Sequence, residues 1–216
     1  EDVEPIVAKE MQTKGQCGDR LTVSYVKGTD DLTLYPVNAL RNRAIAAANT
    51  THYFIVDSDR WPSEGFYKRL NFDLRLKKLT LDPSVVLVAP SFNRRKRNCH
   101  NLKDYNEAWR RCRLRYEGKM PKTKQEMLNC VQKGFCYGID PDRNPGQHST
   151  GLEGWESLTH TRHVECIKST RWEPFVVIRK DVAPSFDERF TGYGEDKISF
   201  ARQLIAMGFR FHVVPD

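Results

Sequence analysis

The chain has 216 residues, a formal net charge of +7 at pH 7 and 39% hydrophobic residues. This length suits one folded domain, and the ordinary apolar content excludes a wholly disordered protein. No stretch reaches the roughly 20 apolar residues of a membrane-spanning helix, so we expect no membrane contact by this segment. The first residues also lack the basic start and apolar run of a signal peptide. A cytosolic protein and the lumenal portion of a longer protein both fit these features.

Basic residues are concentrated in the middle of the chain. One run covers 94–97, and four more arginines lie between 110 and 115. Such clusters bind nucleic acid, acidic glycans or nucleotide phosphates, or they form a solvated surface. The runs taken alone favour the solvated surface.

Six cysteines occur at irregular spacings, without a C-x-x-C pair or paired histidines. A zinc site is therefore a weak interpretation. Disulfides would suit a secretory compartment and free thiols the cytosol. The cysteine count leaves both open.

The first half of the chain alternates between predicted strands and helices. Alternating apolar and polar residues predict a strand at 21–26. A helix is expected at 35–48, where Val37, Leu40, Ala44 and Ala48 fall at helical spacing and Pro36 suits the first turn. Aromatic and β-branched residues predict a buried strand at 52–56, and a helix is expected at 64–81.

The second half begins with a continuous apolar strand at 85–89. A basic, irregular insertion covers 91–167, with one helix at 123–133 capped by Thr123 and Glu126. A strand at 175–178, a helix at 195–207 and a strand at 209–214 complete the chain. Because continuous apolar strands are buried on both faces, the pattern predicts an α/β fold with a sheet between helices.

Asp57 and Asp59 are the candidate metal ligands. They follow a buried strand directly, and ligands of open α/β sheets bind at the carboxyl ends of strands. Carboxylate oxygens suit Mn or Mg, and the phosphate oxygens of a nucleotide sugar can complete the shell. Two acids at the end of a buried strand are also costly without a cation. The alternative is that both acids serve a turn or a helix cap.

Several motifs together resemble the LARGE-type glycosyltransferases and the related β-1,4-glucuronyltransferase (glycosyltransferase family forty-nine). No single motif is decisive, but they occur in the family's order from about residue 21 to the C-terminus. The matching segments are 35–42, 57–59, 61–63, 121–128, a glycine-rich stretch ending at Trp155, 172–181, 186–194 and Lys197.

The resemblance implies a GT-A fold, with a mixed, mostly parallel sheet flanked by helices and an irregular basic insertion. We expect one such domain over residues 1–216. The family's first strands and a metal-binding histidine after the final strand have no counterpart in this sequence. A fragment of a longer chain is therefore expected.

The function implied by the resemblance is a metal-dependent, inverting transfer from a UDP-sugar to a hydroxyl of a glycan or glycoprotein. Mn, or Mg, is the implied cofactor, and glucuronic acid is the first choice of sugar. The implied location is the Golgi or secretory lumen, as part of a membrane-anchored protein. The basic clusters would attract an anionic glycan. The main alternative is a non-catalytic, glycan-binding or assembly subunit, and nucleic-acid binding is a poorer third interpretation.

Asn38, Arg41 and Asn42 match the family's helix on the nucleotide side of the cleft, and they are assigned with Asp57 to binding the nucleotide sugar. Arg41 could bind a phosphate through two hydrogen bonds, and Asn42 could bind ribose or sugar hydroxyls. The alternative is that Arg41 and Asn42 lie on a solvated helix face.

Gly192, Tyr193 and Gly194 also match the family and are assigned to the acceptor site. The following acids, Glu195 and Asp196, depart from the LARGE-type pattern and resemble the catalytic region of other inverting GT-A enzymes. An inverting transfer needs a base within reach of the acceptor hydroxyl. We therefore predict Asp196 as this base, with Glu195 as its competitor. The alternative is that both acids favour the start of a helix through its dipole.

Trp155, Trp172 and Tyr193 are candidates for stacking on sugar rings. Large aromatic residues more often belong to the core, so this remains the alternative for each. Glu173, in a segment that matches the family, is a candidate for hydrogen bonds to acceptor hydroxyls.

Overall fold

The computed structural model describes residues 22, 31, 34–57, 59–94, 110, 120–138 and 149–215. The strand expected at 21–26, most of both arginine clusters and the loop at 140–146 fall outside these residues, apart from Thr22, Arg94 and Arg110. Within the described part, no helix combines the length and the apolar character needed to cross a membrane.

A five-stranded sheet forms the centre of the molecule, in the order β1-β6-β2-β7-β5. These strands are β1 (His52–Phe54), β2 (Val85–Ala89), β5 (Arg162–His163), β6 (Phe175–Arg179) and β7 (Arg210–Val213). The strands predicted at 52–56, 85–89, 175–178 and 209–214 are confirmed, although the first is shorter than expected.

The sheet is mixed, but the expectation that it is mostly parallel is wrong for the described strands. Only β2 and β7 pair in parallel, whereas β1–β6, β2–β6 and β5–β7 are antiparallel. The reason lies in the long excursion between β2 and β6. This segment starts at the end of β2 and finishes at the start of β6, where Ala89 is paired with Phe175. Strand β6 therefore runs antiparallel to β2.

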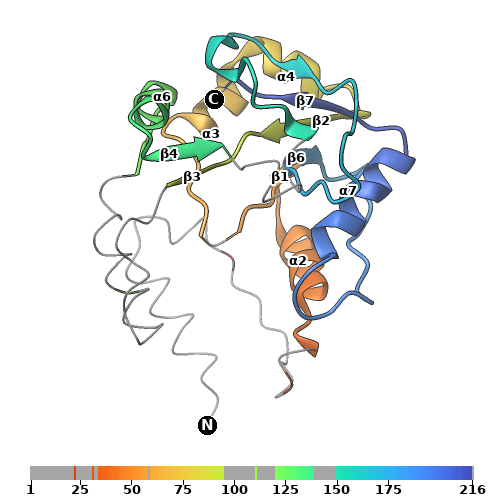
Figure 1. The fold of residues 1–216 in the computed structure, drawn as a ribbon. Helices are drawn as coiled ribbons and strands as arrows, with labels where there is room; N and C mark the ends of the chain where they lie inside the picture. Colours follow the sequence, from red (N-terminus) through yellow and green to blue (C-terminus); the bar gives the residue numbers. More distant parts are fainter. Residues whose placement is uncertain are drawn as a thin grey trace.

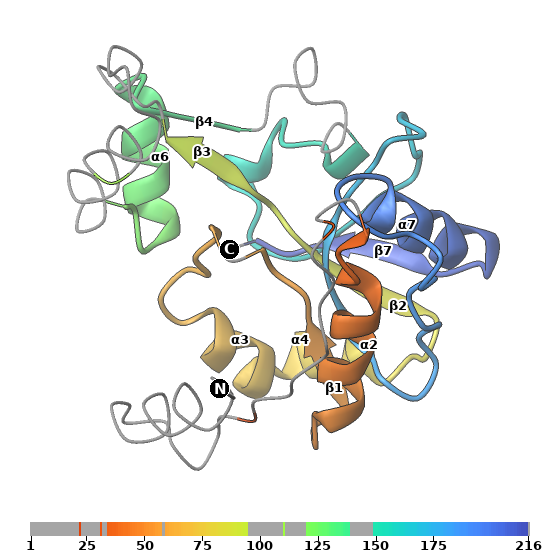
Figure 2. The same cartoon turned by 90° about the horizontal axis from the view of Figure 1, so that it is seen from below.

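Helices cover both faces of this sheet (Figure 1). On one face, α3 (Phe66–Phe72) and α4 (Leu74–Thr80) pack through Phe66 and Leu76 on Val85 and Leu87. On the other face lie α2 (Val37–Ala47) and α7 (Asp196–Ala206), seen from below in Figure 2. Phe200 and Leu204 of α7 belong to the cluster that contains Val86 and Val88. Neighbouring residues of β2 therefore point into different cores, which confirms that the strand is buried on both faces.

The helix expected at 64–81 is divided into α3 and α4 at Asp73. The side chain of Asp73 accepts hydrogen bonds from the backbone N–H groups of Arg75 and Leu76, and so caps the start of α4. The extended backbone of Asp73 ends α3 and starts α4 in a new direction.

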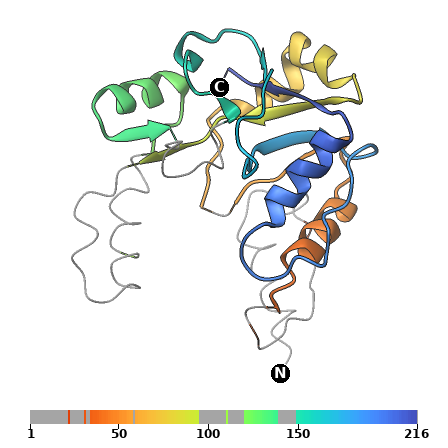
Figure 3. The same cartoon turned by 45° about the vertical axis from the view of Figure 1, so that its right-hand side comes forward.

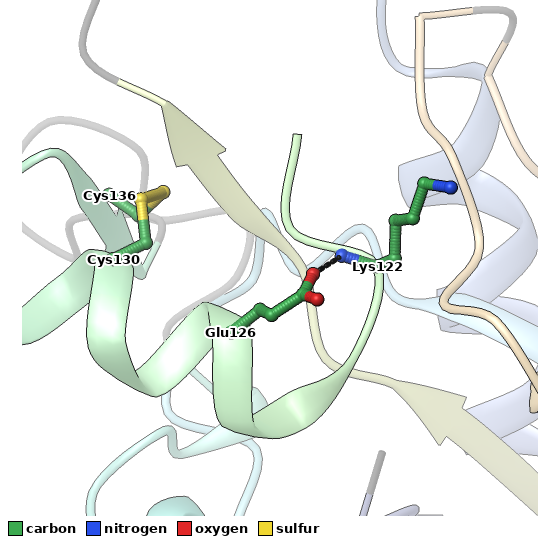
Figure 4. The surroundings of a disulfide bond; sticks show 4 residues. All are labelled: Lys122, Glu126, Cys130 and Cys136. Atoms are coloured by element: carbon green, nitrogen blue, oxygen red, sulfur yellow. Dashed lines mark hydrogen bonds between the residues drawn. A yellow bond between two sulfur atoms is a disulfide. The ribbon is translucent and has the colours of Figure 1, made fainter. Parts of the chain in front are cut away.

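A small unit beside the sheet consists of β3 (Phe92–Arg94), α6 (Lys124–Gln132) and β4 (Cys136–Gly138), with β3 and β4 paired antiparallel (Figure 3). The predicted cap of α6 is confirmed: the Thr123 hydroxyl accepts from Glu126 N–H at 3.2 Å. The Glu126 carboxylate in turn accepts from the backbone N–H of Lys122 at 2.8 Å (Figure 4).

A disulfide between Cys130 and Cys136 ties the end of α6 to β4 (Figure 4). Cys166 is exposed and unbonded, and Cys17, Cys99 and Cys112 lie outside the described residues. The described part of the chain thus contains at least one of the disulfides that the cysteine count left open.

Candidate functional site

The site lies beyond the ends of the strands, where β1 ends and its neighbour β6 begins. Since these two strands are antiparallel neighbours, the residues that follow β1 lie beside those that precede β6. Asp57 comes three residues after the end of β1, and Glu173 two residues before β6. The first turn of α7 reaches the same edge and brings Lys197 to both carboxylates.

Lys197 joins the two carboxylates. Its Nζ lies 2.6 Å from Oδ2 of Asp57, a charge-assisted hydrogen bond, and 3.8 Å from Oε2 of Glu173. The ring of Phe175 lies below the ammonium, with its centroid 5.2 Å from Nζ. Residues that are 140 positions apart in the chain thus form one charged cluster of two acids and one base.

Glu173 lies in an electrostatically unfavourable position. Burial raises the pKa of its carboxyl group above the ordinary value, Lys197 opposes this, and the negative charges of Asp196, Asp57 and Glu195 raise the pKa further. Glu173 therefore holds a proton more readily than an ordinary glutamate.

Asp196 is buried and paired with Arg41. The Arg41 guanidinium donates to Oδ2 of Asp196 and, at 2.9 Å, to the side-chain oxygen of Asn38. It also lies over the ring of Phe186, 5.3 Å from the centroid. These contacts connect α2 to the first turn of α7, and they occupy the carboxylate that we predicted as the base.

Asn38 and Asn42 bind the backbone of the loop that precedes α7. Asn38 is fully buried and donates to the carbonyl of Asp187 at 2.8 Å. Asn42 both donates to the carbonyl of Phe186 and accepts from its N–H, each at 2.9 Å. The solvated helix face offered as the alternative for Arg41 and Asn42 is wrong, because both side chains make these contacts within the protein.

The face of α2 that points into the protein is therefore not the face that carries the apolar residues used to predict the helix. Ala44 is exposed, whereas Asn38, Arg41, Asn42 and Ile45 lie toward the core at helical spacing. The apolar spacing predicted the helix correctly, but a polar stripe orients it.

Asp59 lies next to this cluster on the outside. Its side chain is 77% exposed, compared with 34% for Asp57, and its carboxylate is 3.6 Å from Nε of Arg60. The guanidinium of Arg60 is fixed in turn by a 2.6 Å hydrogen bond to the side-chain oxygen of Asn93. Asp59 is thus directed to solvent beside the half-buried Asp57.

The segment before α7 has an irregular backbone. Gly192, Gly194 and Glu195 all have positive φ angles, of 71°, 98° and 58°, and Gly192 N–H donates to the carbonyl of Tyr35 at 2.8 Å. Positive φ suits glycine but is uncommon for glutamate. The turn leaves the side chain of Tyr193 fully exposed and that of Glu195 exposed, while Asp196 points inward.

Trp155 and Trp172 lie in the core, which matches the alternative given for each. Trp155 is 3% exposed, donates to the carbonyl of Val214 at 3.1 Å and packs on Phe92. Trp172 is 1% exposed and donates to the hydroxyl of Thr150. Neither indole offers a ring face to a sugar in this structure, whereas Tyr193 does.

Asp57 and Asp59 fit part of the shell of a hard divalent cation. Their donors are carboxylate oxygens, and Asp57 already binds a cationic group, the ammonium of Lys197. Within the described residues, no three His, Cys, Asp or Glu side chains come together as a complete metal site. The remaining ligands would have to come from elsewhere, such as the phosphates of a bound nucleotide.

Sequence reasoning missed the role of Lys197, which was noted as part of a matching segment without a function. Its position directly after two acids was the available signal. Its contacts with Asp57 and Glu173 depend on how β1, β6 and α7 meet, which no local pattern reveals.

Comparison with known proteins gives a family match over nearly the whole chain. Residues 4–216 match the family described as "Glycosyl-transferase for dystroglycan". The xylosyl- and glucuronyltransferase LARGE2 of Mus musculus is 29% identical over 198 residues, which cover 91% of this chain and 26% of that protein.

Further relatives have similar names and similar coverage. LARGE1 of Gallus gallus, also a xylosyl- and glucuronyltransferase, is 30% identical over 84% of this chain and 21% of its own length. LARGE2 of Homo sapiens is 29% identical over 85% of this chain and 22% of its own length. The chain thus spans about a quarter of the relatives that it matches.

Proposed function

Since the chain belongs to the LARGE-type family of glycosyltransferases, we propose that it transfers a sugar from a UDP-sugar to a hydroxyl of a glycan or glycoprotein. The observation that carries this proposal is the position of Asp57. It follows β1 at the sheet edge shared with Glu173 and the start of α7, where α/β proteins bind their ligands. The fold that we propose is GT-A.

Asp57 and Asp59 are proposed to hold Mn or Mg together with the diphosphate of the donor. The charge that develops on the departing diphosphate is neutralised by the divalent cation when it is bound. The proposed donor sugar is glucuronic acid. The names of the relatives make xylose the first competitor.

Arg41, Asn38 and Asn42 are proposed to act indirectly. Their side chains hold the loop at 186–188 and the first turn of α7, so they position the nucleotide side of the site. Phosphate and ribose contacts are not proposed for them, because Nη1 of Arg41 and the side-chain amides of Asn38 and Asn42 already have partners within the protein.

Glu195 is now the better choice for the base. Its side chain is exposed beside the turn at 192–194, whereas Asp196 is buried against Arg41. A base must reach the acceptor hydroxyl directly or through one water molecule, and an exposed carboxylate can do so. The exposed Tyr193 and the cluster residue Glu173 are proposed to contact the acceptor.

The proposed location is the secretory lumen, as part of a longer, membrane-anchored protein. The Cys130–Cys136 disulfide supports this, because disulfides persist in oxidising compartments. An anionic glycan remains the proposed partner of the basic clusters.

The decisive test is calorimetric titration of UDP into the protein with Mn, repeated with EDTA and with Asp59→Ala. We expect Mn-dependent binding that weakens at least about tenfold in the variant. Asp181→Ala is the matched control, since Asp181 is an exposed aspartate that follows β6 at the opposite edge of the sheet. Transfer would then be measured with UDP-glucuronic acid and UDP-xylose.

One observation favours the non-catalytic alternative, namely that Asp57 is already paired with Lys197. A folded protein that binds neither UDP nor Mn would support a glycan-binding or assembly subunit. In that case the proposed transferase activity would have to be abandoned for this chain.

A further inference from the structure

Lys197 occupies Oδ2 of Asp57, one of the two carboxylate oxygens that could bind a divalent cation. Its ammonium lies 2.6 Å from Oδ2 of Asp57, within hydrogen-bond distance, and a Mg or Mn ion binds carboxylate oxygens at roughly 2.1 Å. Two cations that share one carboxylate oxygen at such distances repel each other strongly. The ammonium and the metal therefore exclude each other at this oxygen.

The surroundings of the Lys197 side chain explain why its ammonium lies against the carboxylates. The side chain is 18% exposed and lines a small apolar recess with Ile55, Pro174 and Phe186. A partly buried ammonium needs anionic partners, and Asp57 and Glu173 provide them.

Glu173 offers a second position for the same ammonium. Its Oε2 lies 3.8 Å from Nζ, farther than the 2.6 Å contact with Asp57. Lysine has a flexible four-carbon stem and three rotatable donors, so a small movement of the side chain would exchange one carboxylate for the other. Glu173 would benefit, since burial and neighbouring negative charges disfavour its ionised form.

We propose that Lys197 and the divalent cation compete for Asp57, and that Lys197 moves to Glu173 when the cation binds. The inference rests on the proposed metal site, but it concerns Lys197, which competes with the metal for this site. Lys197 offsets the charge of one of the two carboxylates. The free energy needed to break its ion pair with Asp57 would then lower the affinity of the site for the metal.

The first experiment measures the affinity for Mn alone, from the EPR signal of the free ion, without nucleotide. Lys197→Met should bind Mn about fivefold more tightly than the natural protein, because the competing ion pair is gone. Lys78→Met is the matched control: it has the same change in charge on the exposed surface of α4, and its Mn affinity should stay unchanged.

The second experiment uses the natural protein, so it does not depend on whether a variant folds. A crystal structure with Mn and UDP should show Nζ of Lys197 beyond hydrogen-bond distance of Asp57 and within it of Glu173. An ammonium still bonded to Asp57 beside a bound Mn would overturn the inference.

The outcomes separate this inference from the proposed function. Equal Mn affinity in the natural protein and Lys197→Met overturns the competition but leaves the metal site in place. If neither protein binds Mn, with or without UDP, both proposals fail. Mn binding by Lys197→Met alone would support the competition in its strongest form.

Discussion

Two pairs of acidic residues meet at one edge of the sheet, Asp57 with Asp59 after β1, and Glu195 with Asp196 at the start of α7. Each pair has one carboxylate turned inward against a basic side chain and one turned outward to solvent. The difference lies in how firmly the basic partner is held. Arg41, the partner of Asp196, also bonds to Asn38 and packs on Phe186, whereas Lys197 lies between two carboxylates.

This difference separates a structural ion pair from an exchangeable one. The Arg41–Asp196 pair connects two helices, and its guanidinium has several fixed partners, so removing either charge leaves the other buried and unpaired. The pair of Lys197 and Asp57 is more exposed and its ammonium has an alternative acceptor. We therefore expect a ligand to displace the Lys197–Asp57 contact more readily than the Arg41–Asp196 contact.

The strongest test of this comparison is Arg41→Met. The variant leaves the buried carboxylate of Asp196 without its cation, and breaking a buried ion pair in this way costs about 3 kcal/mol or more of unfolding free energy. Chemical denaturation measures this loss. Arg189→Met is the matched control, because Arg189 pairs with Asp187 on the surface, and such pairs contribute under about 1 kcal/mol. Equal losses in the two variants would contradict a special role for Arg41.

A smaller effect is expected for Asn38→Ala. Asn38 is fully buried, and its side chain bonds both the carbonyl of Asp187 and the guanidinium of Arg41. The variant leaves these groups with fewer partners, and we expect a loss of about 2 kcal/mol in unfolding free energy. Asn71→Ala on α3 provides the control, since the side chain of Asn71 bonds the carbonyl of Tyr67 at the surface. A change within about 0.5 kcal/mol at both positions would show that the network is dispensable.

The smallest effect concerns Glu173→Gln and depends on pH. The pKa of Glu173 in the folded protein lies above its ordinary value of 4.5, so the folded state binds this proton more tightly than the unfolded chain. The resulting stabilisation is complete below the ordinary pKa and is lost as the pH rises through the raised value. Gln imitates the protonated form, so the variant should melt about 1–2 °C higher at pH 7.

The melting difference for Glu173→Gln should disappear below about pH 4, where both states carry the proton. Glu153→Gln, at an exposed position, should show no difference at either pH. A variant that melts lower than the natural protein at pH 7 would mean that the ion pair with Lys197 outweighs burial.

The elements of the fold could largely be predicted from local patterns, but their pairing could not. The valine-rich runs of β2 and β6 predicted buried strands correctly, and the Thr123 and Glu126 spacing predicted the start of α6. The antiparallel return of β6 between β1 and β2 depends on the path of the long excursion, which has no local signal. Asp73 was overlooked because the helical pattern continues on both of its sides.

The site shows the same limit. Asp57, Asp59, Glu173 and Asp196 could be chosen by residue type and motif. The structure brings Asp57 and Glu173 to Lys197, and it pairs Asp196 with Arg41. Which acid is paired with which base depends on contacts between elements about 140 residues or more apart. These contacts, and not the motifs, distinguish the buried Asp196 from the half-buried Asp57.

The pairing of Ala89 on β2 with Phe175 on β6 has a consequence for how the lengths of sequences in this family can change. The segment between these two residues adds β5 to the same sheet, but its two ends are held together by the pairing of Ala89 with Phe175. The entropic cost of closing a loop grows only slowly with its length. Insertions and deletions in this segment outside β5 are therefore expected to cost the sheet little, provided that Trp155 and Trp172 still reach the core.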